Sequence, residues 1–202
     1  KNLRLVVVGA EKLPNHLADA FEKKFQCRPL EGYGSTECSP GVALNGLDTN
    51  QSGSVGRLLH DMKAKVVNPD SGIELPIGET GLLKVKGPNV MLGYLGMPDK
   101  TAEVLQNGWY DTGDIVRLDK EGFLWIEGRL SRFSKIGGEM VPHGNIEETL
   151  NELADQNEQI FAVTGVPDEK KGERLVVIHT ANEELLDEVL KKFSDASIPN
   201  LW

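Results

Sequence analysis

The sequence is poor in cysteine, in basic residues and in long apolar runs. Its two cysteines, Cys27 and Cys38, have neither the spacing of a metal site nor that of a redox motif. No apolar run reaches the length that a bilayer-spanning helix needs. Basic residues number 22 against 31 acidic ones, and the net charge of −9 argues against nonspecific binding of nucleic acid, which depends on basic surfaces. The 39% of hydrophobic and 26% of charged residues are typical of a globular protein.

The two ends of the chain lack the features of a complete gene product. The chain starts without Met on a strand-like run, KNLRLVVVGA, and it stops at residues 198–202 with IPNLW. We therefore expect a fragment of a longer protein, with both of its domains truncated.

The first part of the chain has the pattern of an open α/β sheet. Residues 3–8 form an apolar, β-branched run that predicts a buried strand. Leu17, Phe21 and Phe25 follow on one face of a predicted helix. Residues 27–30 predict a short second strand that leads into a polar loop. Ligands of such sheets bind at the carboxyl ends of the strands.

The middle of the chain, residues 53–128, predicts small antiparallel strands or a distorted barrel. Its short apolar runs are separated by clusters of Gly, Pro, Asn and Asp, and residues 119–122 predict a hairpin turn between the last two. The runs are residues 63–67, 82–85, 115–118 and 123–126.

The last part of the chain predicts a small α+β domain. Ile146, Leu150 and Leu153 share a helix face, and Asn145 with Glu148 has the spacing of a capping box. Two strands and a final helix are predicted beyond it. They cover residues 161–163, 175–178 and 185–193.

The predicted fold class is thus α/β. We expect the end of a large α/β domain with a small β-barrel-like subdomain, followed by a small α+β C-terminal domain. The large domain would cover residues 1–128, a hinge residues 129–132, and the small domain residues 133–202.

The first motif with chemical potential is the pentapeptide YGSTE at residues 33–37. Tyr33 offers a ring face for a base, and Gly34 lets the backbone approach a ligand. Thr36 supplies a hydroxyl for a phosphate oxygen, and Glu37 can hold Mg²⁺. Taken alone, the pentapeptide is equally typical of a polar turn after a strand.

Two further motifs follow along the chain. WYDTGD at residues 109–114 places Asp114 after a glycine turn, where a short acceptor suits two adjacent ribose hydroxyls. Taken alone, it is also typical of a hairpin with a solvated aspartate. Residues 128–139 combine a pair of adjacent glycines, a small residue and a basic cluster at the domain boundary. A hinge with a flexible loop needs this composition, which a plain linker can share.

The order of these motifs resembles that of the adenylate-forming superfamily, which comprises acyl-CoA synthetases, adenylation domains and luciferases. YGSTE resembles the family's Tyr-Gly-x-Thr-Glu loop, and residues 109–114 resemble its ribose block. Residues 78–94 resemble the block between them, and residues 128–138 resemble the hinge with its glycine loop. Four blocks in family order cover most of the chain.

The resemblance implies roles for the YGSTE residues in binding ATP. Tyr33 would stack on the adenine, with Gly34 and Ser35 beside the nucleotide in the same loop. Thr36 would contact the α-phosphate. Glu37 would help to hold Mg²⁺.

The resemblance also implies roles for residues in the later blocks. Asp114 would bind the ribose hydroxyls, and Arg129 would approach the ribose or the phosphates. Ser131 occupies the hinge position, where relatives carry Asp or Lys, so the mechanics of the hinge stay open. Gly137 and Gly138 match the loop that lines the path of the thiol once the small domain has rotated.

The implied reaction has two steps. A fatty-acid carboxylate attacks the α-phosphate of ATP to give an acyl-adenylate and pyrophosphate, and a phosphopantetheine thiol then takes the acyl group. The family's phosphate loop is missing from residues 1–32, and the catalytic lysine is expected beyond residue 202. No catalytic residue is therefore assigned, and we expect negligible synthetase activity from the isolated chain.

Within the superfamily, KIGGEMV at residues 135–141 is most similar to the synthetase part of the bacterial bifunctional acyl-[acyl-carrier-protein] synthetase/2-acylglycerophosphoethanolamine acyltransferases. This resemblance implies acyl carrier protein as thiol partner and a lysophospholipid acceptor in a partner domain. It also implies action at the cytoplasmic face, with the parent protein at the inner membrane. Two alternatives stay open: a long-chain fatty acid–CoA ligase, and a nucleotide-binding module without catalysis.

Overall fold

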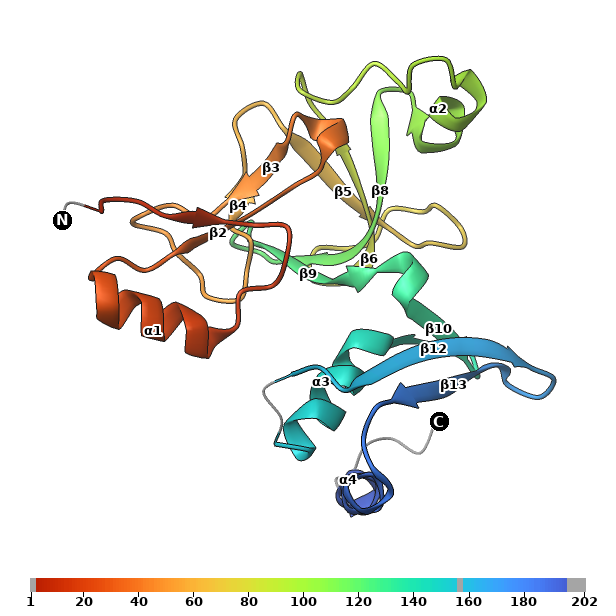
Figure 1. Ribbon diagram of the computed structural model, residues 1–202. Helices are drawn as coiled ribbons and strands as arrows, with labels where there is room; N and C mark the ends of the chain where they lie inside the picture. The colour runs from red at the N-terminus through yellow and green to blue at the C-terminus, as the bar shows by residue number, and fades with distance from the viewer. Residues whose placement is uncertain (1–2, 156–157, 196–202) are drawn as a thin grey trace. The chain divides into compact units, whose positions relative to one another are not determined.

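The computed structural model describes residues 3–155 and 158–195. The chain divides into two compact units, Lys1–Glu127 and Gly128–Trp202 (Figure 1). Within the described residues, no helix is both long and apolar enough to cross a membrane. Rotation about the predicted hinge at residues 129–132 stays a prediction.

The first unit begins with a four-stranded sheet in the order β1-β2-β3-β4. Strand β1 pairs in parallel with β2, and the remaining neighbours pair antiparallel. Helix α1 connects β1 to β2 and lies beside them (Figure 1). This strand–helix–strand order is the predicted open α/β pattern. The elements are β1 (Val7–Val8), α1 (Asn15–Phe25), β2 (Leu30–Gly34), the 3-10 turn η1 (Thr36–Cys38), β3 (Gly41–Leu44) and β4 (Arg57–Leu58).

The two strands predicted for this sheet differ from those observed. The buried strand expected at residues 3–8 is reduced to Val7–Val8, and the side chain of Val7 is exposed. β1 lies at the edge of its sheet, so only one neighbouring strand covers it. The second strand, expected at residues 27–30, begins at Leu30 and runs on to Gly34. It therefore includes Tyr33, which was expected in a loop.

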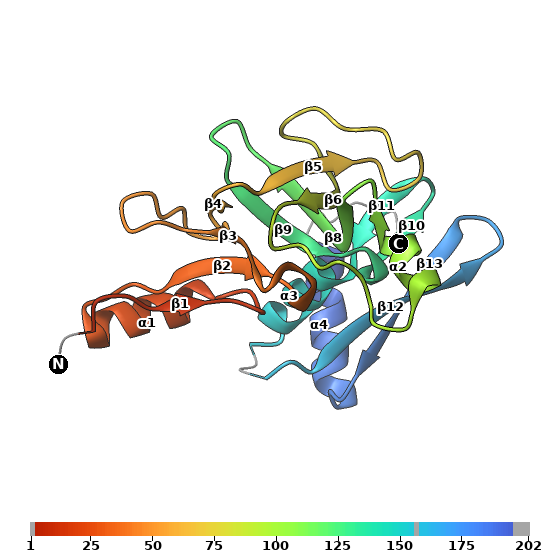
Figure 2. The same ribbon diagram turned by 90° about the horizontal axis from the view of Figure 1, so that it is seen from above.

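A curled five-stranded sheet forms the rest of the first unit (Figure 2). Its path is β5-β6-β8-β7, and β9, off this path, also pairs with β8. Both sheets contribute to one hydrophobic core, which includes Val42 and Ala43 of the first sheet and Leu83, Val85 and Val116 of the second. The elements are β5 (Lys63–Val67), β6 (Thr80–Lys86), α2 (Pro98–Val104), β7 (Leu105–Gln106), β8 (Trp109–Leu118) and β9 (Leu124–Arg129).

The second unit is an antiparallel sheet with two helices. The strand order is β11-β10-β13-β12. Its core combines Ile136 and Phe161 from the sheet with Ile146 and Leu150 of α3 and Val189 of α4. The elements are η2 (Leu130–Arg132), β10 (Phe133–Ile136), β11 (Glu139–Pro142), α3 (His143–Leu153), β12 (Phe161–Asp168), β13 (Gly172–His179) and α4 (Glu183–Asp195).

The start of α3 differs from its prediction. The helix begins at His143, with Pro142 in the N-cap position, so Asn145 lies inside the first turn and cannot cap it. The backbone carbonyl of Asn145 instead accepts a hydrogen bond from the Thr149 hydroxyl at 2.8 Å. The capping-box interpretation was therefore wrong.

Candidate functional site

The YGSTE segment is shaped by the tight turn between β2 and β3. The backbone N–H of Ser35 donates to the carbonyl oxygen of Pro40 at 2.9 Å. A Cβ on Gly34 would lie 1.9 Å from that same oxygen, so no side chain fits at this position. The turn places Thr36 and Glu37 just beyond the carboxyl end of β2. Thr36 is exposed there and Glu37 is half-buried.

The segment that contains Asp114 is a bulged strand, not the predicted glycine turn. Leu82 pairs with Ile115 and Lys84 pairs with Asp111, so Leu83 alone lies opposite three residues of β8. Those three are Thr112, Gly113 and Asp114. Gly113 has a φ of +71°, which a glycine adopts readily. Bulges redirect side chains and are frequent beside functional sites.

Hydrogen bonds from Thr112 and Asp111 hold the bulge in place. The Thr112 hydroxyl donates to the carbonyl of Leu83 at 3.0 Å and accepts from the N–H of Asp114 at 3.1 Å. The Asp111 carboxylate accepts from the N–H of Gly113 at 3.1 Å and lies 3.4 Å from the Lys84 ammonium. The backbone of Asp114 is thus held by Thr112, and that of Gly113 by Asp111.

Tyr33 and Asp114 meet, although 81 positions of sequence separate them. The Tyr33 hydroxyl donates a short hydrogen bond to Oδ2 of Asp114. Burial and the negative charge of Asp114 raise the pKa of Tyr33, so its hydroxyl stays protonated and remains a donor. The structure therefore brings the first two motifs together at one place. The predicted stacking of Tyr33 and ribose binding by Asp114 stay predictions.

Glu37 is held by a residue to which the sequence assigned no role, Tyr94. The Tyr94 hydroxyl donates to Oε1 of Glu37 at 2.8 Å. The pKa of Glu37 is lowered by its own backbone N–H and then by this hydroxyl, so the carboxylate is ionised at neutral pH. The sequence signal for Tyr94 was its place in the family block of residues 78–94.

The residues around Glu37 fit a magnesium ion that is shared with a nucleotide. No group of three or more His, Cys, Asp and Glu side chains is arranged to hold a metal within residues 3–155 and 158–195. Mg²⁺ is commonly bound by one or two carboxylates together with substrate phosphates and water. The single ionised carboxylate of Glu37, next to the Thr36 hydroxyl in the same turn, is consistent with this mode of coordination.

The third motif belongs to the second unit. Arg129 is the last residue of β9, and Ser131 lies in the turn η2. Directly after Ser131, the Arg132 guanidinium contacts both carboxylate oxygens of Glu147, at 2.6 and 2.7 Å. That carboxylate also accepts from the N–H of Val163 at 2.6 Å. The far end of the predicted hinge is thus fixed to α3 and β12, and the roles of Arg129 and Ser131 stay predictions.

Gly137 and Gly138 form the turn of the β10–β11 hairpin. Their φ angles are +59° and +95°, and two positive φ angles are what the favoured two-residue hairpin turn requires. A Cβ at either position would meet no atom within 4 Å. Turn geometry therefore explains both glycines without a ligand, and their role beside a thiol stays a prediction.

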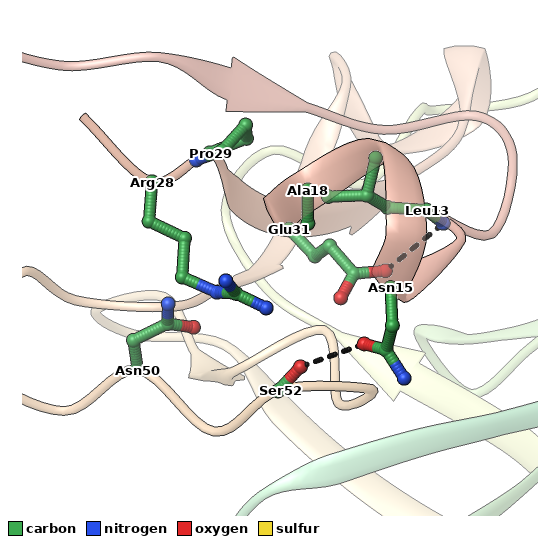
Figure 3. A pocket seen from close by; sticks show the side chains of 8 residues that line it. All are labelled: Leu13, Asn15, Ala18, Arg28, Pro29, Glu31, Asn50 and Ser52. Atoms are coloured by element: carbon green, nitrogen blue, oxygen red, sulfur yellow. Dashed lines mark hydrogen bonds between the residues drawn. The ribbon is translucent and has the colours of Figure 1, made fainter. Parts of the chain in front are cut away.

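A shallow pocket lies apart from these motifs, between α1, β2 and the loop after β3 (Figure 3). Glu31 accepts there from the N–H of Leu13 at 3.2 Å, and Ser52 donates to Asn15 at 3.1 Å. The pocket contains none of the predicted nucleotide-binding residues, and its polar contacts tie elements together. We assign it a structural role. Its lining residues are Leu13, Asn15, Ala18, Arg28, Pro29, Glu31, Asn50 and Ser52.

Comparisons with known proteins identify the family of this chain. Residues 1–95 match the AMP-binding enzyme family. The chain is 41% identical over 188 residues to a long-chain-fatty-acid–CoA ligase of Escherichia coli O6:H1, which covers 93% of this chain and 33% of that protein. It is 37% identical to the ligase of the same name from Yersinia pestis, covering 98% and 36%. The chain therefore spans about a third of the length of these curated relatives.

Solved structures agree with this assignment. The ATP-bound MatB from Rhodopseudomonas palustris matches with a TM-score of 0.81 and 31% identity, over 98% of this chain and 40% of that one. An anthranilate CoA ligase in complex with anthranoyl-AMP matches with a TM-score of 0.77 and 26% identity, over 98% and 39%. The chain belongs to the adenylate-forming superfamily of AMP-binding enzymes.

Proposed function

We propose that the chain is part of an ATP-dependent ligase that activates a carboxylic acid as its acyl-adenylate. The observation that carries the proposal is the meeting of Tyr33 with Asp114, beside the turn that presents Thr36 and Glu37. An aromatic ring, a carboxylate acceptor, a hydroxyl and a second carboxylate are the groups that base, ribose, phosphate and Mg²⁺ require.

Each of these residues would have its own role in binding the nucleotide and its metal. Asp114 accepts hydrogen bonds from the two ribose hydroxyls, and the Tyr33 hydroxyl keeps its carboxylate in one orientation. Thr36 contacts the α-phosphate, where the substrate carboxylate attacks. Glu37 would hold Mg²⁺, which when bound neutralises phosphate charge. Charge stabilisation of this kind is usually the largest contribution in such reactions.

We propose a long-chain fatty acid as the acid and CoA as the thiol. The support is the name of two bacterial relatives, which are long-chain-fatty-acid–CoA ligases that match over nearly the whole chain. CoA is thereby better supported as acceptor than acyl carrier protein, the acceptor expected first from the sequence.

Acyl carrier protein remains the second candidate acceptor. The segment KIGGEMV at residues 135–141 favours it through the resemblance described above. Transfer to a lysophospholipid and association of the longer protein with the inner membrane depend on the same resemblance and stay predictions.

The test is pyrophosphate exchange into ATP by the full-length protein, with and without palmitate. We expect exchange that depends on the fatty acid. Thioester formation with CoA and with holo-acyl carrier protein, measured side by side, then selects the acceptor. Binding of ATP without exchange for any fatty acid would instead support the nucleotide-binding module and overturn the ligase.

A further inference from the structure

We propose that Tyr94 is a positioning residue, which orients the carboxylate of Glu37 toward the divalent cation of a bound metal–ATP complex. This inference rests on the proposed function, because it presumes that Glu37 holds the cation. From the sequence alone, Tyr94 has no role beyond membership of a family block.

Glu37 is fixed at two points by the segment that contains Tyr94. The Tyr94 hydroxyl donates to Oε1 of the carboxylate at 2.8 Å. The backbone N–H of Met91 donates to the carbonyl of Glu37 at 2.7 Å. The first contact sets the orientation of the side chain, and the second sets the position of the backbone that carries it.

The segment before Tyr94 is also anchored to the turn around Glu37. The side-chain amide of Asn89 donates to the carbonyls of Cys38 at 2.5 Å and Gly41 at 2.7 Å. Those carbonyls lie just after Glu37, at the end of η1 and the start of β3. Together with the Met91 contact, they bind residues 89–94 to the YGSTE turn as one local structure.

Tyr94 is itself held on its other side by α2. Its backbone N–H donates to the Thr101 hydroxyl at 2.8 Å, and that hydroxyl donates to the carbonyl of Met97 at 2.9 Å. A Cβ on Gly93 would lie 2.7 Å from the Thr101 methyl carbon, so the approach of the two segments depends on glycine. Tyr94 therefore has a fixed base from which to orient Glu37.

Core packing alone does not account for the position of the Tyr94 hydroxyl. The neighbouring Leu92 and Leu95 are fully exposed, at 100% and 101%, and the packing of this segment against the core comes from Val90 and Met91. Within it, the Tyr94 hydroxyl points to the one carboxylate of the YGSTE turn. Carboxylates that bind metals are typically hydrogen-bonded by outer groups, whose loss costs roughly 10- to 100-fold in metal affinity or activity.

The Glu37 carboxylate can bind a cation while it accepts the hydrogen bond from Tyr94. A carboxylate offers about four lone-pair sites, and the Tyr94 hydroxyl takes only one of them, at Oε1 of the half-buried Glu37. Holding the side chain in advance reduces the rotamer entropy lost when the cation binds.

The experiment measures Mn²⁺ binding to the full-length protein in the presence of ATP by electron paramagnetic resonance, alongside the Mg²⁺ dependence of pyrophosphate exchange. Tyr94→Phe removes only the hydroxyl. We expect Tyr94→Phe to weaken Mn²⁺ binding about tenfold and to raise the half-saturating Mg²⁺ concentration by a similar factor. The rate at saturating Mg²⁺ and the melting temperature should stay near those of the wild type. Leu92→Ala, in the same segment, should change neither.

One further variant, at Glu37, separates this inference from the proposed function. Glu37→Gln should weaken Mn²⁺ binding at least as much as Tyr94→Phe. If Glu37→Gln weakens it and Tyr94→Phe does not, the inference is wrong and the proposed function stands. If Glu37→Gln leaves Mn²⁺ binding unchanged, the metal role of Glu37 fails, and the inference fails with it.

A double-mutant cycle provides a second test. Glu37→Asp keeps the charge but withdraws the carboxylate from both the Tyr94 hydroxyl and the cation, so it should weaken Mn²⁺ binding at least as much as Tyr94→Phe. The double variant should be no worse than Glu37→Asp alone, because the contact that Tyr94→Phe removes is already lost. Fully additive losses would contradict a shared contact.

Discussion

At the scale of single residues, Gly34 shows how closely the YGSTE turn is determined. Replacing it with Ala would put a Cβ 1.9 Å from the carbonyl oxygen of Pro40, a backbone atom that cannot move without opening the β2–β3 turn. We expect Gly34→Ala to destabilise the protein by about 1–3 kcal/mol and to lower its melting temperature by several degrees. The measurement is thermal unfolding followed by circular dichroism.

Gly144→Ala is the matched control for this variant. Gly144 lies in the first turn of α3, and a Cβ there would meet no atom within 4 Å. Ala favours helix over Gly by roughly 0.5–1 kcal/mol, so this variant should be neutral or slightly stabilising. Equal melting temperatures for Gly34→Ala and wild type would refute the steric account of the turn.

At the scale of elements, the start of α3 contains a buried histidine with a predictable response to pH. His143 is 4% exposed, and its Nε2 lies 2.8 Å from the Ser134 hydroxyl. Its pKa is lowered below the ordinary 6.5, first by burial and then by Arg132 of η2, while Glu147 of α3 and Glu173 of β13 oppose the shift. The folded protein therefore holds His143 neutral at a pH where the unfolded chain protonates it.

The sign of the effect follows from proton binding. Below about pH 6.5 the unfolded chain binds a proton that the folded one does not, so stability falls as the pH decreases toward the lowered folded pKa. Urea unfolding at pH 7.5 and pH 5.5 should show this loss in the wild type and a smaller one in His143→Gln. An identical pH dependence in the two proteins would show that His143 does not contribute.

Strands were predictable where the local sequence pattern alone determines them, and features that depend on distant residues were not. Residues 63–67, predicted as a strand from their short apolar run, form β5 with the predicted bounds. The bulge that redirects Asp114 was mistaken for a turn, because it depends on Leu83 in a different strand. The contact of Tyr94 with Glu37 was likewise not predictable, since no local pattern pairs residues 57 positions apart.

At the scale of the whole molecule, the order of four short motifs identified the superfamily before any contact was known. The match over residues 1–95 and the solved relatives agree with that identification and with the mixed α/β fold. The acceptor thiol was less predictable, because the nucleotide motifs are common to ligases with different acceptors. The names of the relatives favour CoA over the carrier protein expected first.

The proposed nucleotide site depends on the bulge of β8, which would present Asp114, and not Asp111, to the ribose of ATP. Asp111 lies in the same strand and pairs with Lys84 at 3.4 Å, so it provides a matched control. The most direct measurement is the ATP affinity of the full-length protein, by isothermal titration calorimetry, for Asp114→Asn and Asp111→Asn. We predict a loss of about tenfold for Asp114→Asn, which weakens two charge-assisted hydrogen bonds, and little change for Asp111→Asn. Unchanged affinity in Asp114→Asn, or an equal loss in both variants, would contradict the assignment of this site.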